Sequence, residues 1–449
     1  MRIKDLLRAI ALALMSFALI HCPQKQTRQK YTVFFTNDLQ AHLLPDRNGR
    51  GGLARIAYLV KKAKAENPGA ILVDAGDSSV GTAFGTETRG EAVFRVMNAV
   101  GYDAAVLGNH EFDLAAEQTR RYQRIAKFPL LACNIRERDS KPFSQEYKIF
   151  QMTKLRLGVT GIANPKTETL VDQAGISGLN FLSPESEIRR IQAELSGQAD
   201  VLIVLSHQGF KQDLSLAYHL AGIPLIIGGH SEIKLSKLIP ANDTYLAQAE
   251  HFGFWLGRID FSWHPETRTA GDFQYHLIPI TEKIPEDPET REAIEQEQKN
   301  LPVGLERIIG TSLRQLSKDF IGFWTAELIK SEGKADLGII NTAGVRSEIS
   351  PGEIAPMDIY EIMPFNDRIC VFEIDGSELK RLKSLGWFYF SRGPKISPGK
   401  TYIVASSDYL LKVKDFPSAQ NPRFFEPLLR DQMIKRIEKD QGFKRFWEK

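Results

Sequence analysis

Residues 102–113 read YDAAVLGNHEFD, in which an apolar run ends at Gly108 and is followed by Asn109, His110 and Asp113. A short apolar run that stops at a glycine is typical of a buried β-strand. Asp113 follows His110 at a spacing that lets its carboxylate hold the imidazole in one tautomer and orientation. The stretch therefore predicts a strand whose carboxyl end carries a histidine with a fixed direction.

The same succession of an apolar run and polar residues recurs through the first half of the chain. It is found at YTVFFTND (31–38), AILVDAGD (70–77), ADVLIVLSHQG (199–209) and IPLIIGGHSE (223–232), and LRLGVTGIAN (155–164) reads as a further strand. Segments with helical apolar spacing, 51–67 and 186–195, lie between these runs. The alternation predicts a layered α/β domain, which we expect over residues 31–283.

The polar residues after these strands are ordinary singly but indicate a metal site jointly. Asp38 with Gln40 can cap a turn, and an isolated His207 or His230 is more often a surface or core histidine. In α/β sheets, however, ligands bind outside the carboxyl ends of the strands. The topology therefore brings these Asp, Asn and His side chains to one edge, in the pattern of a metal centre.

The rest of the chain predicts a linker and a second domain. Residues 284–304 are charged and helix-forming, with proline near the start, so we expect a linker helix there. Over 305–449 a helical pattern (317–331), a strand (335–344) and the segment 363–382 predict a smaller mixed α/β domain. The charged tail, 423–449, predicts an amphipathic helix that packs on this domain or, alternatively, faces a membrane.

The N-terminus predicts export. Basic residues precede an apolar stretch from Ala9 to Ile20 that is too short to span a bilayer and fits a signal peptide over residues 1–22. Cys22 stands where a bacterial lipoprotein is cleaved and lipidated, although His21 replaces the usual small residue. We expect an exported protein of the periplasm or cell envelope, anchored to the membrane by lipid at Cys22; the alternative is an ordinary signal peptide or an uncleaved anchor.

Charge and cysteine content exclude other classes of protein. The net charge is +3, and no dense Lys/Arg run is interleaved with aromatic residues. We therefore expect no nucleic-acid partner. Beyond Cys22 only Cys133 and Cys370 remain, one in each expected domain. They predict two buried free thiols rather than a disulfide framework.

The motifs TND, GD, GNHEFD, SHQG and GGHSE occur in an order and spacing that resemble the calcineurin-like metallophosphoesterases. More narrowly, the chain resembles the exported bacterial 5′-nucleotidase and UDP-sugar hydrolase family, because GIINTAGVR and MPFND are similar to that family's C-terminal substrate-binding domain. The resemblance covers about residues 31–410. It implies an α+β four-layer sandwich for the first domain and hydrolysis of a phosphoester as the activity.

The resemblance also implies roles for individual residues. One metal ion would be held by Asp38, Gln40, Asp77 and Glu232, and a second by Asp77, Asn109, His207 and His230. The two divalent ions would share a hydroxide that attacks phosphorus in line. His110, oriented by Asp113, would stabilise the developing charge.

This sequence departs from the family at the first of these positions. Gln40 stands where the family usually has His, and Glu232 where it has Gln or His. The resulting ligands are all oxygen, which suits Mn²⁺, Mg²⁺ or Ca²⁺ better than Zn²⁺. We therefore expect a harder or weaker first ion, with Co²⁺ and Zn²⁺ as further possibilities; a less favoured alternative is that His42 replaces the missing ligand.

Substrate residues are expected in the second domain. Arg346 matches a phosphate- or nucleotide-contacting arginine of the family, and a guanidinium suits a bidentate phosphate contact; Asn366 and Arg368 are weaker candidates. Phe388 or Phe390 would stack on a nucleobase, unless that aromatic run is a buried strand. The loop that carries the second stacking aromatic in the family is absent here.

These observations predict a phosphohydrolase for nucleoside 5′-monophosphates. One alternative is the same chemistry on a UDP-sugar, a sugar phosphate or a sulfur ester, which the missing loop favours. Another is a non-catalytic surface lipoprotein that binds a ligand, which the changes at Gln40 and Glu232 favour.

Overall fold

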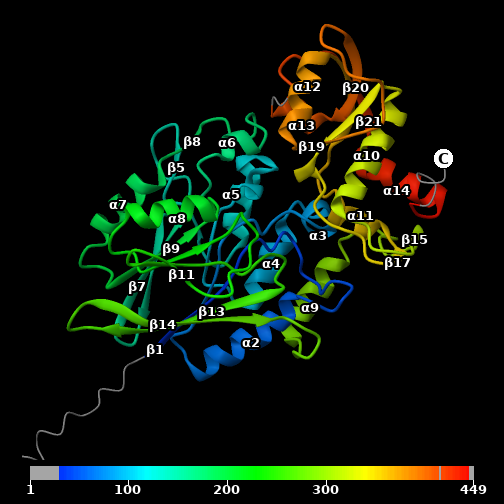
Figure 1. Cartoon of the computed structure of the whole chain (residues 1–449). Helices are drawn as coiled ribbons and strands as arrows, with labels where there is room; N and C mark the ends of the chain where they lie inside the picture. Colours follow the sequence, from blue (N-terminus) through cyan, green and yellow to red (C-terminus); the bar gives the residue numbers. More distant parts are fainter. Residues whose placement is uncertain (1–29, 414–415, 444–449) are drawn as a thin grey trace, which may run out of the picture.

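The computed structural model describes residues 30–413 and 416–443, so the predicted signal peptide and Cys22 lie outside the described residues. Figure 1 shows two bodies, with the C-terminal one in yellow to red. Within the described residues, no helix combines the length and the apolar character needed to cross a membrane. Cys133 and Cys370 are both free and buried, as predicted.

The first body contains two six-stranded sheets. The first has the order β14–β13–β1–β2–β3–β4, with β1 Lys30–Thr36, β2 Ile71–Asp74, β3 Ala104–Val106, β4 Leu130–Leu131, β13 Trp255–His264 and β14 Thr269–Pro279. The second has the order β11–β12–β10–β9–β7–β6, with β6 Tyr147–Met152, β7 Leu155–Ile162, β9 Val201–Ser206, β10 Leu225–Gly228, β11 Ile239–Ala241 and β12 Thr244–Ala247. Strands β1 to β4 are parallel, as are β7, β9 and β10, so their carboxyl ends share one edge of each sheet.

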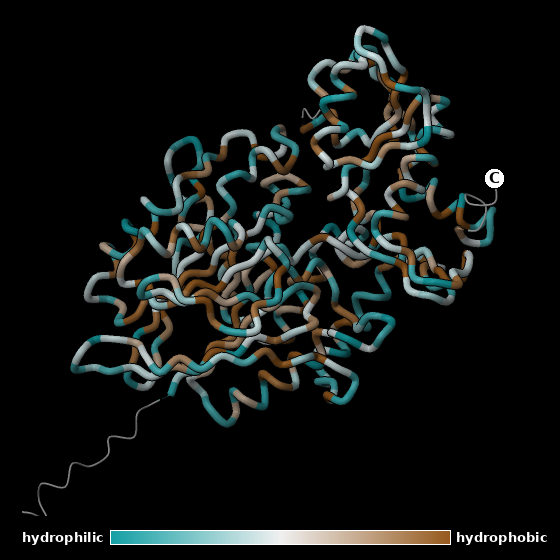
Figure 2. The backbone as a smooth tube through the Cα atoms, in the orientation of Figure 1, coloured by the Kyte–Doolittle hydropathy of each residue, from teal (hydrophilic) through white to brown (hydrophobic). Residues whose placement is uncertain are grey.

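Alternation along the strands builds the layers. Val33 and Phe35 of β1 pack with Val159 of β7 and Ile203 of β9, so one core lies between the two sheets. Phe34, on the opposite face of β1, packs instead with residues of the covering helices. Because successive strand residues point to opposite faces, one sequence supplies both cores. The result is the predicted four-layer sandwich, and Figure 2 shows hydrophobic positions gathered along its sheets.

Helices cover the outer faces of both sheets. Those packed on the first sheet are α2 (Leu53–Glu66), α4 (Glu91–Val100) and α5 (Ala115–Ile125), and those on the second are α7 (Pro184–Glu194) and α8 (Phe210–His219). The helices predicted at 51–67 and 186–195 are confirmed as α2 and α7. Shorter elements complete the body: α3 Ala83–Glu87, η1 His110–Phe112, β5 Ile135–Glu137, α6 Thr167–Leu170 and β8 Leu179–Phe181.

Helix α9 (Pro288–Gln298) forms within the predicted linker. Asp287 caps its start by accepting the N–H of Thr290, and proline at the first turn costs no hydrogen bond there. Ile294 is buried in the core of the first body, so α9 packs against α2 and α4 rather than standing free.

The C-terminal body is built on a five-stranded sheet of order β19–β16–β20–β18–β21. Its strands are β16 Leu337–Asn341, β18 Arg368–Asp375, β19 Phe388–Phe390, β20 Thr401–Ser407 and β21 Gln420–Leu428, and β15 Gly310–Ser312 pairs with β17 Gly352–Ile354. Its helices are α10 Lys318–Gly333, α11 Pro356–Ile362, α12 Gly376–Leu385, α13 Asp408–Lys412 and α14 Leu429–Asp440, with η2 at Thr342–Gly344. The predicted mixed α/β character of this region is confirmed.

The tail differs from its prediction. A helix was expected from residue 423, but β21 continues to Leu428 and pairs with β18, so Phe424 lies on an edge strand and is 59% exposed. In the part of the tail that the structure describes, up to residue 443, α14 is the helical element, and it buries Leu429, Met433 and Ile437 against the sheet. Pairing with β18 gives the backbone N–H and C=O groups of this segment their hydrogen-bond partners. The spacing of apolar residues in the sequence does not show that such a strand edge is available.

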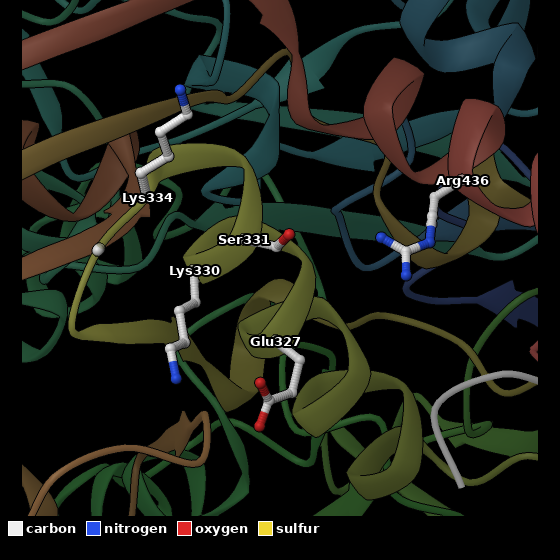
Figure 3. A pocket seen from close by; sticks show the side chains of 6 residues that line it. Glu327, Lys330, Ser331, Lys334 and Arg436 are labelled. Atoms are coloured by element: carbon white, nitrogen blue, oxygen red, sulfur yellow. The ribbon is translucent and has the colours of Figure 1, made fainter. Parts of the chain in front are cut away.

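A hollow of about 410 Å³ lies between α10 and α14 (Figure 3). Glu327, Lys330 and Ser331 project from α10, and Arg436 projects from the facing helix. None of these residues was predicted for the site.

Hydrogen bonds join the two bodies beside the edge where the first-sheet strands end. Tyr360 donates to Glu87 at 2.7 Å, and Thr86 donates to the carbonyl of Pro364 at 2.7 Å. Tyr409 donates to the carbonyl of Leu170 at 2.9 Å. The C-terminal body is thereby placed over the polar strand ends of the first.

Candidate metal centre

The loops after β1, β2, β3, β9 and β10 meet at one edge of the sandwich and are tied by backbone hydrogen bonds. The N–H of Asp38 donates to Gly76 O at 2.9 Å, and that of Gln40 donates to Asp77 O at 2.9 Å. Between the second-sheet loops, the N–H of Gly229 donates to Ser206 O at 2.8 Å. These backbone hydrogen bonds hold the loops against one another.

Several predicted ligands have left-handed backbone conformations. The φ angles are 51° at Asp38, 45° at Gln40, 56° at Asp77, 69° at His230 and 52° at Glu232. Each such residue costs about 1 kcal/mol relative to an ordinary conformation. The surrounding hydrogen bonds offset this cost, and strained backbone concentrated at one place is typical of a functional site.

Asp77, His207 and His230 form the tightest group of ligating side chains. One ligand atom from each lies within 4.8 Å of the others. His207 Nε2 is 2.9 Å from Asp77 Oδ2, and both side chains are buried. Asn109 follows the neighbouring strand β3 and is also buried. Three of the four residues predicted for the second ion are therefore brought to one place, and Asn109 precedes His110, whose N–H donates to Asp77 Oδ1 at 2.8 Å.

Unpaired polar atoms show that this group suits a cation. His207 Nδ1 is 2.6 Å from Ala75 O, which can only accept, so Nδ1 donates. Nε2 carries a proton while the ring is charged beside Asp77, and it offers a lone pair once the ring is neutral. Within the described residues, His207 Nε2 and Asn109 Oδ1 are buried without a hydrogen-bond partner. A divalent ion ligated by nitrogen and oxygen can take the place of the proton between His207 Nε2 and Asp77 Oδ2, and the carbonyl oxygen of the Asn109 side chain is available to it.

The charged side chains of this group shift one another's pKa values. Burial works to raise the pKa of Asp77, but the charges of His207 and His110 hold it below its usual range. Burial works to lower the pKa of His207, and the charge of Asp77 outweighs it and raises the pKa to about 10. At Asp38, burial raises the pKa to about 8 against the opposing charge of His207. The buried carboxylates therefore favour a positive charge at this edge.

The first predicted metal position is arranged differently. Gln40 Nε2 donates to Glu232 Oε1 at 2.6 Å, so the amide and the carboxylate bind each other. Arg346 Nη2, from the C-terminal body, donates to Gln40 Oε1 at 3.0 Å and to Glu232 Oε1 at 3.1 Å. The predicted residues are brought together, but their ligand atoms already bind a cation of the protein.

Two histidines lie beside this position. His251 Nδ1 is 3.6 Å from Glu232 Oε2, and it is buried without a hydrogen-bond partner among the described residues. Burial works to raise the pKa of Glu232, but the charges of Arg346 and His251 lower it. His42 stacks on Phe252 and its Nδ1 lies 2.9 Å from the carbonyl of Gln40, so the structure gives it a packing role.

His110 and Asp113 have the predicted relationship. His110 Nδ1 lies 2.7 Å from Asp113 Oδ2, so the ring donates to the carboxylate and Nε2 is directed elsewhere. His110 Nε2 is 3.9 Å from Asp77 Oδ2. Burial works to lower the pKa of His110, but the charges of Asp113 and Asp77 raise it to about 9. The ring is thus held at the metal group with its free nitrogen directed inward.

Phe365 of the C-terminal body was missed from the sequence. Its ring stacks on His110 with centroids 5.8 Å apart. Arg430, which is 2% exposed, donates to the carbonyl of Phe365 at 3.1 Å and to Asn366 Oδ1 at 2.9 Å. The buried guanidinium therefore fixes the segment that covers His110.

Glu111 was also missed, although it stands inside GNHEFD. Its carboxylate accepts the backbone N–H groups of Asp77 (3.1 Å), Ser78 (2.9 Å), Ser79 (3.1 Å) and Gly108 (2.7 Å). It is 2% exposed and ties the β2 loop to the β3 loop. A glutamate between a histidine and a phenylalanine in a buried motif was the available signal, because a buried carboxylate needs several donors.

Gly108 is expected to be essential for the position of Asp77. A Cβ atom at Gly108 would lie 2.1 Å from Asp77 Oδ1 and 2.6 Å from Asp77 N. We expect Gly108→Ala to weaken Mn²⁺ binding by at least about tenfold, since displaced ligands lose affinity on this scale. Isothermal titration of the metal-free protein measures it. Gly271→Ala, whose added Cβ meets nothing closer than 3.6 Å, is the control; equal affinity of the two variants would refute the role.

The predicted substrate residues are not all gathered at the centre. Arg346 reaches it, as described. Asn366 and Arg368 are exposed, and the side-chain oxygen of Asn366 accepts a hydrogen bond from Arg430. Phe388 and Phe390 pack against the core on one face of the C-terminal sheet, and the Phe388 ring lies 6.0 Å from that of buried Phe416. The exposed aromatic of this segment is Trp387, which is 64% exposed.

Comparison with known proteins agrees with this geometry. Residues 31–232 match the model of the calcineurin-like phosphoesterases, and residues 304–384 match that of the 5′-nucleotidase C-terminal domain. A 5′-nucleotidase of Vibrio cholerae is 26% identical over 412 residues, which cover 78% of this chain and 74% of the relative.

Solved structures agree in fold. A 5′-nucleotidase precursor from Thermus thermophilus has a TM-score of 0.84 at 21% identity, covering 92% of this chain and 97% of that one. A sulfate thiohydrolase from the same organism has a TM-score of 0.81 at 17% identity, covering 92% and 94%. The chain therefore contains a calcineurin-like phosphoesterase domain followed by a 5′-nucleotidase C-terminal domain, and it is a hydrolase.

Proposed function

We propose that this chain is an exported, metal-dependent phosphohydrolase that releases phosphate from nucleoside 5′-monophosphates. The observation that carries the proposal is the convergence of Asp77, His207 and His230 within 4.8 Å, with His110 Nε2 directed at the same Asp77 oxygen. The name of the Vibrio cholerae relative supports the nucleotide as substrate.

The metal-binding residues and His110 have different roles in the proposed reaction. Asp77, Asn109, His207 and His230 would hold a divalent ion, which would act as a Lewis acid and activate water when bound. The reaction forms a bond from water oxygen to phosphorus and breaks the bond from phosphorus to the ester oxygen. His110, held by Asp113 and covered by Phe365, stabilises the charge that develops on the phosphoryl oxygens. The two-ion mechanism predicted from the sequence requires an ion at Asp38, Gln40 and Glu232 as well.

Arg346 is the residue of the C-terminal body that is placed to meet the substrate phosphate. Its Nη2 is engaged with Gln40 and Glu232, whereas Nε and Nη1 make no hydrogen bond among the described residues. A phosphoryl oxygen can therefore bind the guanidinium without displacing its existing partners.

A second candidate is the same chemistry on a phosphoester or sulfur ester without a base. The packing of Phe388 and Phe390 against the C-terminal core favours it, because neither ring projects as a free platform. The fold similarity to a thiohydrolase is compatible with both candidates.

Substrate and metal dependence can be tested together. The purified protein is stripped of metal and given Mn²⁺, Mg²⁺, Ca²⁺, Co²⁺ or Zn²⁺, with 5′-AMP, 5′-UMP, UDP-glucose and an aryl phosphate as substrates. We expect release of phosphate from the nucleoside monophosphates only when an ion is present. Turnover of the aryl phosphate or UDP-glucose alone would favour the second candidate. No turnover with any ion would contradict hydrolysis and favour a binding module.

Export and lipid anchoring at Cys22 remain part of the proposal and rest on the sequence of residues 1–22. Cell fractionation tests them: wild-type protein should sediment with membranes, and Cys22→Ser should not. Equal distribution of the two would refute the lipid anchor.

A further inference from the structure

We propose that the guanidinium of Arg346 supplies the positive charge at the first metal position, so that the chain binds one divalent ion, at Asp77, in place of the two ions expected from its sequence. The inference concerns binding at the metal centre and does not depend on which ester is the substrate.

The first argument is that the ligand atoms of this position are already used. Gln40 offers its oxygen to Arg346 at 3.0 Å and its nitrogen to Glu232 at 2.6 Å. An amide nitrogen that donates a hydrogen bond cannot ligate a cation, and Glu232 Oε1 accepts from both partners. A divalent ion bound by Gln40 Oε1 and Glu232 Oε1 would have to compete with the guanidinium for both oxygens.

The second argument is the position of Asp38. Its carboxylate accepts the N–H of His230 at 3.0 Å and the side-chain N–H of Asn37 at 2.7 Å. Asp38 therefore holds the loop that carries His230. Among the described residues, the tight ligand group comprises Asp77, His207 and His230, without Asp38, Glu232 or His251. Asp38, Asp77 and Glu232 do not form such a group among the described residues. Asp38 Oδ1 instead lies 3.9 Å from His207 Nε2.

The third argument is charge. Glu232 has a carboxylate where an uncharged Gln or His was expected, and Arg346 lies 3.1 Å from it. Lys318 and His251 act on the same carboxyl, so its negative charge is balanced by groups of the chain. The side chains of Arg346 and Glu232 are 19% and 27% exposed, so the pair is partly shielded from solvent. Adding a divalent cation beside the guanidinium is costly there, because like charges repel more strongly where water is excluded.

The arrangement leaves a function for the guanidinium. Arg346 is permanently charged and planar, and its Nη2 faces the residues of the first position. Its remaining N–H groups can bind a phosphoryl oxygen, as the first ion would. Because Arg346 comes from the C-terminal body, this charge reaches the centre only when the two bodies are in contact.

Metal stoichiometry tests the inference without an activity assay. Metal-free protein is dialysed against Mn²⁺, and bound manganese per chain is counted by mass spectrometry. We expect one Mn²⁺ per wild-type chain, with the electron paramagnetic resonance spectrum of an isolated ion. Arg346→Met should bring the count toward two and produce the spectrum of a coupled pair.

Two further variants control for the fold and for domain contact. Arg346→Lys keeps a positive charge and should stay at one ion. Arg47→Met removes a different ion pair between the bodies, to Asp358, and should also stay at one. Two ions in the wild-type chain, or one ion in Arg346→Met, would overturn the inference. Failure of nucleotide hydrolysis would leave these counts unchanged, so the two proposals fail separately.

Discussion

Asp77→Asn should remove the bound metal and lower phosphohydrolase activity by roughly a thousandfold, because a bound ion contributes several kcal/mol and about 1.4 kcal/mol is tenfold. The substitution preserves the shape of the side chain. In the wild-type chain the N–H of His110 donates a hydrogen bond to Asp77 Oδ1 at 2.8 Å. The Oδ1 atom of Asn can still accept this hydrogen bond. The loop should therefore keep its conformation.

The loss follows from the other side-chain atom. Asp77 Oδ2 lies 2.9 Å from His207 Nε2. In the variant the negative charge that raises the pKa of His207 is gone, so the ring is neutral and the amide nitrogen of Asn would donate a hydrogen bond to its lone pair. The new bond satisfies His207 internally and replaces the negative charge that attracts an ion. The wild-type side chains can ligate a metal ion, and those of the variant cannot.

Bound Mn²⁺ per chain and kcat with 5′-AMP are the measurements, together with a thermal melt. Asp243→Asn, at an exposed position after β11, is the matched control and should match the wild type in all three. If Asp77→Asn kept its metal and its activity, the site would have to be placed elsewhere.

His110→Ala should lower kcat by about a hundred- to a thousandfold while the metal content stays at the wild-type value. Donors directed at charge developing in a transition state contribute on this scale. His110 Nε2 is directed toward Asp77 at 3.9 Å, but within the described residues it is not in the tight ligand group. Its removal should therefore affect the reaction more than binding of the ion.

Asp113→Asn should have a smaller effect, about ten- to a hundredfold in kcat, because it acts through His110. The 2.7 Å bond to His110 Nδ1 can be kept by the amide oxygen, but the negative charge that favours a positively charged ring is lost. The double variant should be no slower than His110→Ala alone. Additive losses, or a fall in metal content with His110→Ala, would contradict the assigned roles.

The predictions from sequence succeeded where the signal was local. The strand ends at Asp74, Val106, Ser206 and Gly228 follow from apolar runs that stop at polar or glycine residues, and the helices α2 and α7 follow from apolar spacing. The spacing of His110 and Asp113 also predicted their hydrogen bond. In each case the structure is determined by residues close in the chain and by burial of an apolar face.

The predictions were incomplete where an edge or a packing partner mattered. The apolar spacing of the tail predicted a helix from residue 423, yet residues 423–428 complete the sheet beside β18. Phe388 and Phe390 were left open between base platform and core, and their position in the fold places them against the core. A strand edge or a buried face exists only after other parts of the chain have folded.

By itself, the pattern of the sequence determined a layered α/β first domain, the mixed C-terminal domain and the polar strand ends that make the centre, because alternation and glycine-bounded strands act over a few residues. The four layers were implied by the family resemblance. Only the tertiary structure decided how those residues are used. The bond from Arg346 to Gln40 spans 306 positions of the chain, and the one to Glu232 spans 114. Such contacts depend on how two separately built cores meet, and the sequence around Gln40 contains no local signal that a guanidinium lies beside it.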